Sequence, residues 1–181
     1  GTLLCLTPGE SISMKDSDNT CPSKGWILAF HPDLICGTVL GANIRDYTFF
    51  SYRPEEALHV SLREKQVILE LLDKINEELQ RCIDCYSQKI ISKYIELLLD
   101  YCERFYERQF ITRNEANKKI IERFDRLLDD HFNTIQSQSS DLPTIEECVR
   151  VLRLSPAYFN DLLEYETGKS YKEYLQFKRF E

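Results

Sequence analysis

Hydrophobic side chains recur every three or four residues over most of the chain beyond residue 60. This spacing places them along one face of an α-helix. It predicts long helices over residues 62–80, 87–108 and 113–132, each with one apolar face. The face of the second helix is broad and consists of Ile91, Tyr94, Ile95, Leu98, Leu99, Cys102, Phe105 and Tyr106.

A Ser or Thr followed three residues later by Glu occurs at four positions where a helix is expected to begin. In such a capping box, the hydroxyl and the carboxylate each accept a hydrogen bond from a backbone N–H that the first turn leaves unpaired. These pairs therefore predict four helix starts, at Ser61 with Glu64, Thr112 with Glu115, Thr144 with Glu147, and Ser170 with Glu173.

Residues 1–60 differ in composition, because they contain five of the six glycines and four of the six prolines. These residues separate short apolar runs, and β-prone runs between turn residues are typical of strands. The runs are Thr2–Leu6, Ser11–Met14, Trp26–Phe30, Thr38–Leu40 and Tyr47–Tyr52. The chain as a whole is therefore predicted to be α+β and mostly α.

A polar stretch at 133–141 predicts a linker, and a compact pair of helices follows it. The first of these helices covers residues 145–152. After a short turn, the second covers about 156–166. Two helices joined in this way have the geometry of a helix-turn-helix.

The ends of the second helix carry clear signals. Ser155 is a favourable N-cap, and Pro156 stands at the first helical position, where proline loses no hydrogen bond. Gly168 suits the left-handed conformation that ends many helices. Ser170 then begins a last helix.

Charge and hydropathy narrow the classes of function. The 181 residues carry a net charge of −7, which argues against a general polyanion binder, because lysine and arginine supply non-specific affinity for nucleic acid. Mean hydropathy is −0.39 and no apolar run is long enough for a membrane span. Seven scattered cysteines, with no basic leader before them, predict reduced thiols and a cytoplasmic protein.

Chemistry-bearing motifs are few. Cys82 and Cys85 form a C-x-x-C that lacks the second pair or nearby His of a zinc site, so we interpret them as ordinary thiols. His59 is either a metal ligand of a cupin or a structural histidine, and the missing His-x-His favours the structural role. We find no nucleophile with a base, phosphate-binding glycine loop or catalytic carboxylate pair. The sequence therefore predicts a protein that is not an enzyme and needs no metal or cofactor.

The helix-turn-helix resembles that of AraC-type transcription regulators, in their Bacteroidetes-like form. The resemblance rests on Leu142-Pro143-Thr144-Ile145-Glu146-Glu147-Cys148, on Leu154-Ser155-Pro156 with Tyr158-Phe159 and Asp161-Leu162-Leu163, and on Glu166-Thr167-Gly168-Lys169-Ser170 with Glu173-Tyr174. It extends upstream to Tyr47, Phe49-Phe50-Ser51-Tyr52, Ala57-Leu58-His59, Tyr101-Cys102, Arg104-Phe105-Tyr106 and Arg108-Gln109-Phe110.

This resemblance implies an organisation in three parts. Residues 1–60 would be part of a cupin-like β-sandwich, 61–135 a helical dimerisation and linker region, and 142–181 the first helix-turn-helix of an incomplete DNA-binding domain. The chain is accordingly expected to be a fragment that lacks most of the sandwich and the second helix-turn-helix. The implied partners of the full regulator are double-stranded DNA, a second copy of the chain, and a small-molecule effector bound by the absent N-terminal part.

The resemblance also implies that the helix at about 156–166 enters the major groove. Ala157, Asn160 and Asp161 would then face the bases, flanked by Tyr158 and Glu164. Asparagine suits an adenine edge, aspartate a cytosine amine and alanine a thymine methyl. Phosphates would be held by Thr144, Ser155 and Lys169.

Three positions depart from the family pattern: Glu164 where a basic residue is common, Val149 where a small residue is common, and Arg153 in the turn. Residues 141–181 carry eight acidic and six basic side chains, a net charge of −2. We therefore expect the fragment alone to bind DNA weakly or not at all.

Alternatives remain for the middle of the chain and for its function. The broad helical face that includes Ile95, Leu98, Leu99, Cys102 and Phe105 is either core or a dimer interface. One rival function is a helical protein-interaction module whose helix-turn-helix does not read DNA. A second rival is a cupin-type enzyme, which the missing metal ligands disfavour.

Overall fold

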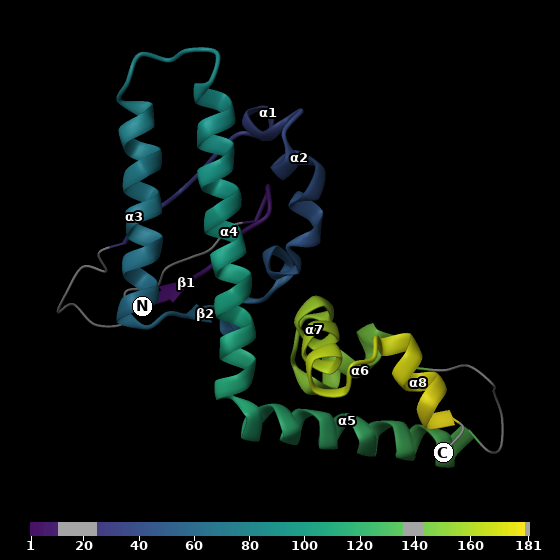
Figure 1. Cartoon of the computed structure of the whole chain (residues 1–181). Helices are drawn as coiled ribbons and strands as arrows, with labels where there is room; N and C mark the ends of the chain where they lie inside the picture. Colours follow the sequence, from purple (N-terminus) through teal and green to yellow (C-terminus); the bar gives the residue numbers. More distant parts are fainter. Residues whose placement is uncertain (11–24, 136–142, 180–181) are drawn as a thin grey trace. The chain divides into compact units, whose positions relative to one another are not determined.

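The computed structural model describes residues 1–10, 25–135 and 143–179. The chain forms two compact units (Figure 1). Unit 1 contains Gly1, residues 6–47 and residues 60–102. Unit 2 contains residues 2–5, 48–59 and 103–181. The long helix α4 (Ser87–Thr112) contributes its first part to unit 1 and its last part to unit 2.

Unit 1 is built on α3 (Leu62–Leu79) and the first part of α4, which lie side by side (Figure 1). Most of the expected apolar face of each helix is buried or half-buried. In α3 the buried residues are Ile68, Leu71 and Ile75, while Leu79 at its end is exposed, and in this part of α4 they are Ile91, Ile95, Leu98 and Leu99. The short helices α1 (Pro32–Ile35) and α2 (Val39–Asn43) and the 3-10 helix η1 (Ile44–Asp46) complete the unit.

The start of α4 holds α1 in place through side chains. The Gln88 amide donates to three carbonyl oxygens around the end of α1, and the Ser92 hydroxyl donates to the carbonyl of Leu34 at 3.1 Å. Residue 41 in α2 must be glycine, because a Cβ there would overlap the carbonyl of Ile35.

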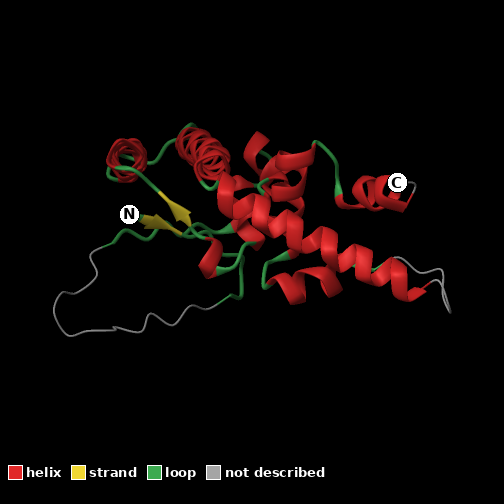
Figure 2. Ribbon diagram, turned by 90° about the horizontal axis from the view of Figure 1, so that it is seen from below, coloured by secondary structure: helices red, strands yellow, loops and turns green. Residues whose placement is uncertain are grey.

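The β-structure expected in residues 1–60 is largely wrong for the described residues. Among the described residues only Thr2–Leu3 (β1) and Leu58–His59 (β2) pair, antiparallel, and Figure 2 shows them among helices and loops. Residues 26–30 form no strand, Thr38 caps α2, and Thr48–Ser51 form the 3-10 helix η2. The predicted strand Ser11–Met14 lies outside the described residues.

A physical reason underlies this correction. β-propensity measures how a side chain fits against neighbouring strands, so an isolated apolar run has nothing to enforce pairing. At residue 38 a local interaction decides instead, because the Thr38 hydroxyl accepts the N–H of Gly41 and starts a helix. The mostly α character of the chain is confirmed, but the described residues contain no β-sandwich.

Unit 2 is an aromatic-rich helical assembly of α5 (Asn114–Ile135), α6 (Ile145–Leu152), α7 (Pro156–Thr167) and α8 (Tyr171–Arg179). Its core contains Phe124, Leu128, Cys148, Val149, Leu152, Phe159, Leu163, Tyr171, Tyr174 and Leu175. Because α5 shares this core with α6–α8, the expected boundary between residues 135 and 142 does not separate packing units.

The predicted capping boxes at Ser61 and Thr144 are confirmed. At Ser170, the backbone N–H and the hydroxyl both donate to the Glu173 carboxylate, at 2.8 and 2.6 Å. The box predicted at Thr112 is wrong, because α4 continues through this residue, whose hydroxyl donates to the carbonyl of Gln109.

A buried side chain marks the junction of α4 and α5 instead. The Asn117 amide donates to the carbonyl of Phe110 at 2.9 Å, and Asn117 is 1% exposed. This bond gives a side-chain partner to a carbonyl in the last turn of α4, where the carbonyls lack partners within the helix. Among the described helices, none combines the length and apolar character that crossing a bilayer requires.

Candidate nucleic-acid interface

The sharp turn between α6 and α7 fixes how the two helices meet. Arg153 ends α6 in the left-handed conformation, with φ of 61°, and the N–H of Leu154 donates back to the carbonyl of Val149 at 3.1 Å. These are features of a helix C-terminus that reverses direction, usually with glycine at the left-handed position. Ser155 then begins α7, its hydroxyl accepting the N–H of Tyr158 at 3.2 Å.

A dry apolar face holds α7 against its neighbours. Phe159 and Leu163 are completely buried, and the Phe159 ring meets Phe124 of α5 edge to face at 4.9 Å between centroids. Val149, on α6, is 3% exposed in the same core. The inward face of α7 is therefore fully used in packing, so any ligand must meet its other faces.

Three of the residues expected to face DNA lie on a face of α7 that is at least partly open. Glu164 is exposed, while Ala157 and Asn160 are half-buried. The side-chain oxygen of Asn160 accepts the N–H of Tyr171 at 3.3 Å, which ties α7 to the start of α8. Among the described residues, the side-chain N–H groups of Asn160 make no hydrogen bond, so they are the groups that could donate to a base.

Ser155 is engaged inside the protein. Its backbone N–H and its hydroxyl both donate to the carboxylate of Glu56, at 2.7 and 2.5 Å, and Ser155 is 3% exposed. Glu56 closes the 3-10 helix η3 (Pro54–Glu56), where its second contact is the N–H of Arg53 at 2.7 Å. The expected phosphate-binding position is thus occupied by a carboxylate of the same chain.

Asp161 is also engaged. Its carboxylate accepts hydrogen bonds from the Thr48 hydroxyl at 2.5 Å and the Tyr52 hydroxyl at 2.6 Å. Burial, and secondly the charge of Asp161, raise the pKa of Tyr52, so its hydroxyl keeps the proton that it donates. The side chain expected to read a base therefore contacts residues 48–52.

Tyr158 is buried among aromatic rings rather than available to a ligand. It is 3% exposed, and its ring lies 5.1 Å from Tyr52 and 5.4 Å from Phe110, centroid to centroid. Tyr52 in turn meets Tyr106 edge to face at 5.1 Å. Burial raises the pKa of Tyr158, which keeps this hydroxyl protonated as well.

The two remaining phosphate candidates are more accessible. Thr144 is exposed at the start of α6, although its hydroxyl accepts the N–H of Glu147 at 3.4 Å. Lys169 is half-buried, and its amine lies 5.0 Å from the centroid of the Phe177 ring, a cation–π contact.

The expected dimer face is not available as a surface. Four of its five side chains, Ile95, Leu98, Leu99 and Cys102, are buried in the part of α4 that belongs to unit 1, and Phe105 is buried in unit 2. These residues supply the chain's own core, which was the alternative interpretation of the stripe. The exposed apolar residues of α4 are Ile90, Leu97 and Ile111.

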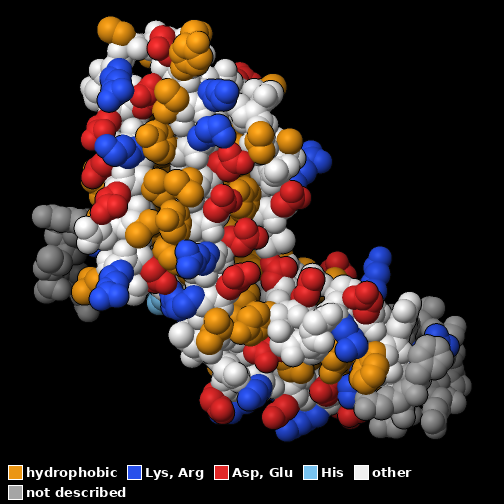
Figure 3. All heavy atoms as spheres, in the orientation of Figure 1, with side chains coloured by type: hydrophobic (Ala, Val, Ile, Leu, Met, Phe, Trp, Pro, Cys, Tyr) orange, Lys and Arg blue, Asp and Glu red, His pale blue; other side chains and the backbone are white. Residues whose placement is uncertain are grey.

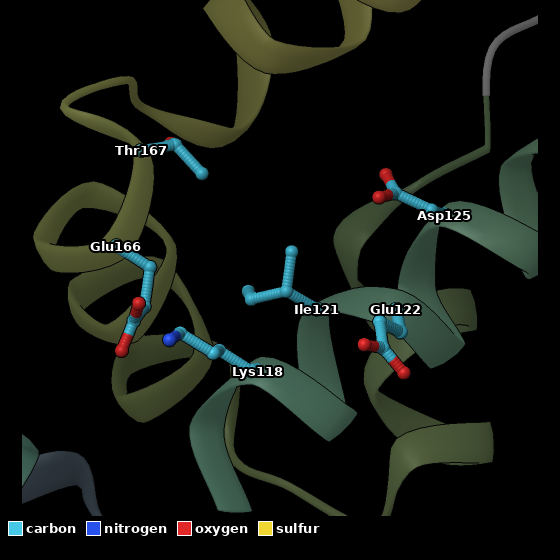
Figure 4. A pocket seen from close by; sticks show the side chains of 6 residues that line it. All are labelled: Lys118, Ile121, Glu122, Asp125, Glu166 and Thr167. Carbon is cyan, nitrogen blue, oxygen red and sulfur yellow. The ribbon is translucent and has the colours of Figure 1, made fainter. Parts of the chain in front are cut away.

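A pocket of about 200 Å³ lies between α5 and α7 (Figure 4). Its lining combines the amine of Lys118 with three carboxylates and two less polar side chains, namely Glu122, Asp125, Glu166, Ile121 and Thr167. One carboxylate oxygen of Glu166 is buried and has no hydrogen-bond partner in the part of the chain that the structure describes. The acidic lining is unsuited to phosphate, so we do not count this pocket as part of a nucleic-acid interface.

His59 and the C-x-x-C pair were the candidate metal ligands of the sequence. The His59 ring lies 3.0 Å from the carbonyl of Ala57 and 3.3 Å from the Arg113 guanidinium, a structural environment. Cys82 and Cys85 are exposed. Among the described residues, no group of three His, Cys, Asp or Glu side chains is placed to hold a metal ion.

Glu56 is the functional candidate that sequence reasoning missed. The only local signal was Pro54 two residues before it, which with Glu56 is typical of a short helical turn. Nothing in that signal indicated Ser155 as its partner. Comparison of the chain with protein-family models, curated proteins and solved structures finds no match in any of them.

Proposed function

We propose that the chain is part of a sequence-specific DNA-binding regulator of the AraC type, with α7 as the helix that enters the major groove. The observation that carries the proposal is the α6–turn–α7 unit, with α6 and α7 both capped, the turn fixed by a left-handed residue, and the unit packed on α5. A rigid helix pair with one face of its second helix open is the arrangement by which helix-turn-helix proteins dock on DNA.

Asn160 and Glu164 are the proposed contacts on the open face of α7. The amide of Asn160 can donate to an adenine edge while its oxygen keeps the Tyr171 contact. The exposed carboxylate of Glu164 lies on the face that the DNA backbone would approach. Its negative charge repels phosphate and so weakens binding to DNA of any sequence. Thr144 and Lys169 lie at helix ends where they can contact phosphate.

Selection of bound sites from a random pool of duplex DNA tests the proposal directly. A duplex of about 30 base pairs accommodates two half-sites one helical turn apart. We expect enrichment of a defined motif, and Asn160→Ala should lower affinity for it roughly tenfold or more, as loss of a base contact does. Asn76→Ala, an exposed asparagine of α3, is the matched control and should leave binding unchanged.

A charge reversal separates phosphate contact from base reading. Glu164→Lys should tighten binding to every duplex and steepen the dependence of affinity on salt by about one phosphate contact. Glu70→Lys makes the same change of charge at an exposed position of α3, and it should change neither the affinity nor its dependence on salt. Failure to enrich any motif, with no response to Glu164→Lys, would show that α7 does not read DNA in the conformation described here.

A helical protein-interaction module is the second candidate function. It is favoured by the engagement of Ser155 and Asp161 within the chain and by the acidic surface of α7. Figure 3 shows hydrophobic side chains along α3 and α4. Leu79, Ile90 and Leu97 are exposed on these helices, and Ile83 and Tyr86 are exposed in the connection between them. Both candidate functions are compatible with a homodimer, which sedimentation of the chain would detect, so the DNA selection above is the experiment that distinguishes them.

A further inference from the structure

Three side chains of one short segment occupy polar groups that the resemblance to AraC-type regulators assigns to DNA. Thr48 and Tyr52 bind the carboxylate of Asp161, and Glu56 binds Ser155. All five residues belong to unit 2. We call Thr48, Tyr52 and Glu56 the clasp.

Glu56 takes the place of an anion at the start of α7. The first N–H groups of a helix are unpaired and carry partial positive charge, which makes a helix N-terminus a natural position for phosphate. The carboxylate receives both the Ser155 N–H and its hydroxyl, and Glu56 is 4% exposed. A DNA phosphate cannot use these donors while the carboxylate holds them.

Thr48 and Tyr52 act on the groove side of the same helix. They use one oxygen of the Asp161 carboxylate, which then cannot accept from a base in the same direction. The Tyr52 ring also covers Tyr158, with 5.1 Å between centroids. In this arrangement η2 and η3 lie over α7 residues that would otherwise face DNA.

The far end of the segment is anchored independently of α7. The N–H of His59 donates to the side-chain oxygen of Gln109 at 2.8 Å, and Arg108 donates to the carbonyl of His59 at 2.7 Å. These contacts to the end of α4 remain if the clasp leaves α7. The segment can therefore return to α7 as an intramolecular competitor, which a dissolved anion cannot do.

We propose that the clasp is a built-in competitor of DNA, so that the chain with its clasp closed does not bind through Ser155 and Asp161, and opening the clasp restores binding. This inference rests on the proposed function. The apparent affinity of a protein that is mostly in a closed state falls in proportion to the open fraction. Weakening the clasp should accordingly raise DNA affinity without any change in α7.

The test compares variants that remove single polar groups and preserve shape. Thr48→Val with Tyr52→Phe removes both hydrogen bonds to Asp161, and Glu56→Gln removes the charge at Ser155. Tyr47→Phe is the matched control, because the Tyr47 hydroxyl donates to the Asp100 carboxylate at 2.5 Å within unit 1. Glu64→Gln, in the capping box of α3, controls for loss of a helix-start carboxylate.

Binding is measured by titrating a duplex selected with the Glu56→Gln variant, and hydrogen exchange of residues 154–162 is measured in parallel. We expect the clasp variants to bind about tenfold more tightly than the unchanged chain, the effect of losing a hydrogen bond to a charged group. Exchange over 154–162 should rise in the clasp variants and not in the two controls.

The outcomes distinguish this inference from the proposed function. Equal binding by the unchanged chain and the clasp variants, or tighter binding by the controls as well, overturns the clasp and leaves DNA reading intact. Absence of DNA binding by every variant, with exchange showing that residues 154–162 have been uncovered, overturns both. Tighter binding confined to the clasp variants, together with faster exchange, supports both.

Discussion

The carboxylate of Glu56 accepts hydrogen bonds from both the backbone N–H and the hydroxyl of Ser155, 99 positions further along the chain. Both residues are buried, so neither has water as a substitute partner. A polar group buried without a partner is costly, and this pair is therefore a structural element of unit 2 as well as part of the clasp.

Removing the carboxylate should destabilise unit 2. Glu56→Ala leaves the Ser155 N–H and hydroxyl without their acceptor, and we expect a loss of about 2–4 kcal/mol in the free energy of unfolding. Ser155→Ala should cost about 1–3 kcal/mol through loss of the N-cap and of one bond to Glu56.

Urea denaturation measures both effects, and the double variant should cost clearly less than the two single ones together. Glu55→Ala, at the exposed neighbouring position, is the control and should change stability by less than about 0.5 kcal/mol. Additive losses for Glu56 and Ser155 would show that the two groups do not stabilise each other.

The left-handed residue between α6 and α7 predicts a stabilising substitution. Arg153 is exposed, has φ of 61°, and is the only described non-glycine residue with positive φ. Arg153→Gly should raise the melting temperature, because glycine adopts this conformation without the cost of about 1 kcal/mol that a Cβ brings. Arg150→Gly, inside α6, should lower stability by about 1 kcal/mol. Equal effects of the two glycines would contradict the assigned turn.

Acid should weaken the starts of α6 and α8. The pKa of the Glu147 carboxyl lies below its ordinary value of 4.5, mainly because the carboxylate accepts the N–H of Thr144. The pKa of Glu173 is lowered in the same way, mainly by the hydroxyl of Ser170. A lowered pKa means that the unfolded chain binds more protons, so the stabilisation is present above pH 4.5 and is lost as pH falls below it.

Thermal unfolding between pH 6 and about pH 3 should therefore show a decline in stability that Glu147→Gln and Glu173→Gln make shallower. Glu146→Gln is the matched control, because Glu146 is exposed in the same first turn and the capping box of α6 is formed by Glu147. If the two cap variants lose stability with falling pH as steeply as the unchanged chain, then other carboxyls cause the acid sensitivity.

Thiol labelling should divide the described cysteines into two groups. Cys36, Cys82 and Cys85 are exposed, while Cys102 and Cys148 are buried. Burial raises the pKa of Cys5 to about 12 and also raises that of Cys148, which leaves little reactive thiolate near neutral pH. At pH 8 a maleimide should modify the exposed three first. Mass-spectrometric mapping of each peptide checks this order, and early modification of Cys102 or Cys148 would contradict it.

Local signals were enough to predict most helices. The expected limits 62–80, 145–152 and 156–166 differ from the observed helices by at most one residue at either end, because caps and apolar spacing act within a few residues. The prediction at Thr112 was wrong because the hydroxyl bonds within α4. A capping pattern in the sequence shows only that a side chain is able to cap a helix. The end of α4 is marked instead by Asn117, which is buried and bonds to the carbonyl of Phe110.

The sequence by itself determined the helical nature of the chain, the positions of α3, α6 and α7, and which residues form their inward faces. It did so because hydrogen bonds within a helix, and its caps, join residues that are close in sequence. Only the tertiary structure decided that residues 48–51 and 54–56 form 3-10 turns, that Glu56 reaches Ser155, and that Thr48 and Tyr52 reach Asp161. These contacts span about a hundred residues, and no local preference specifies them, since they exist only once the aromatic core has brought the segments together.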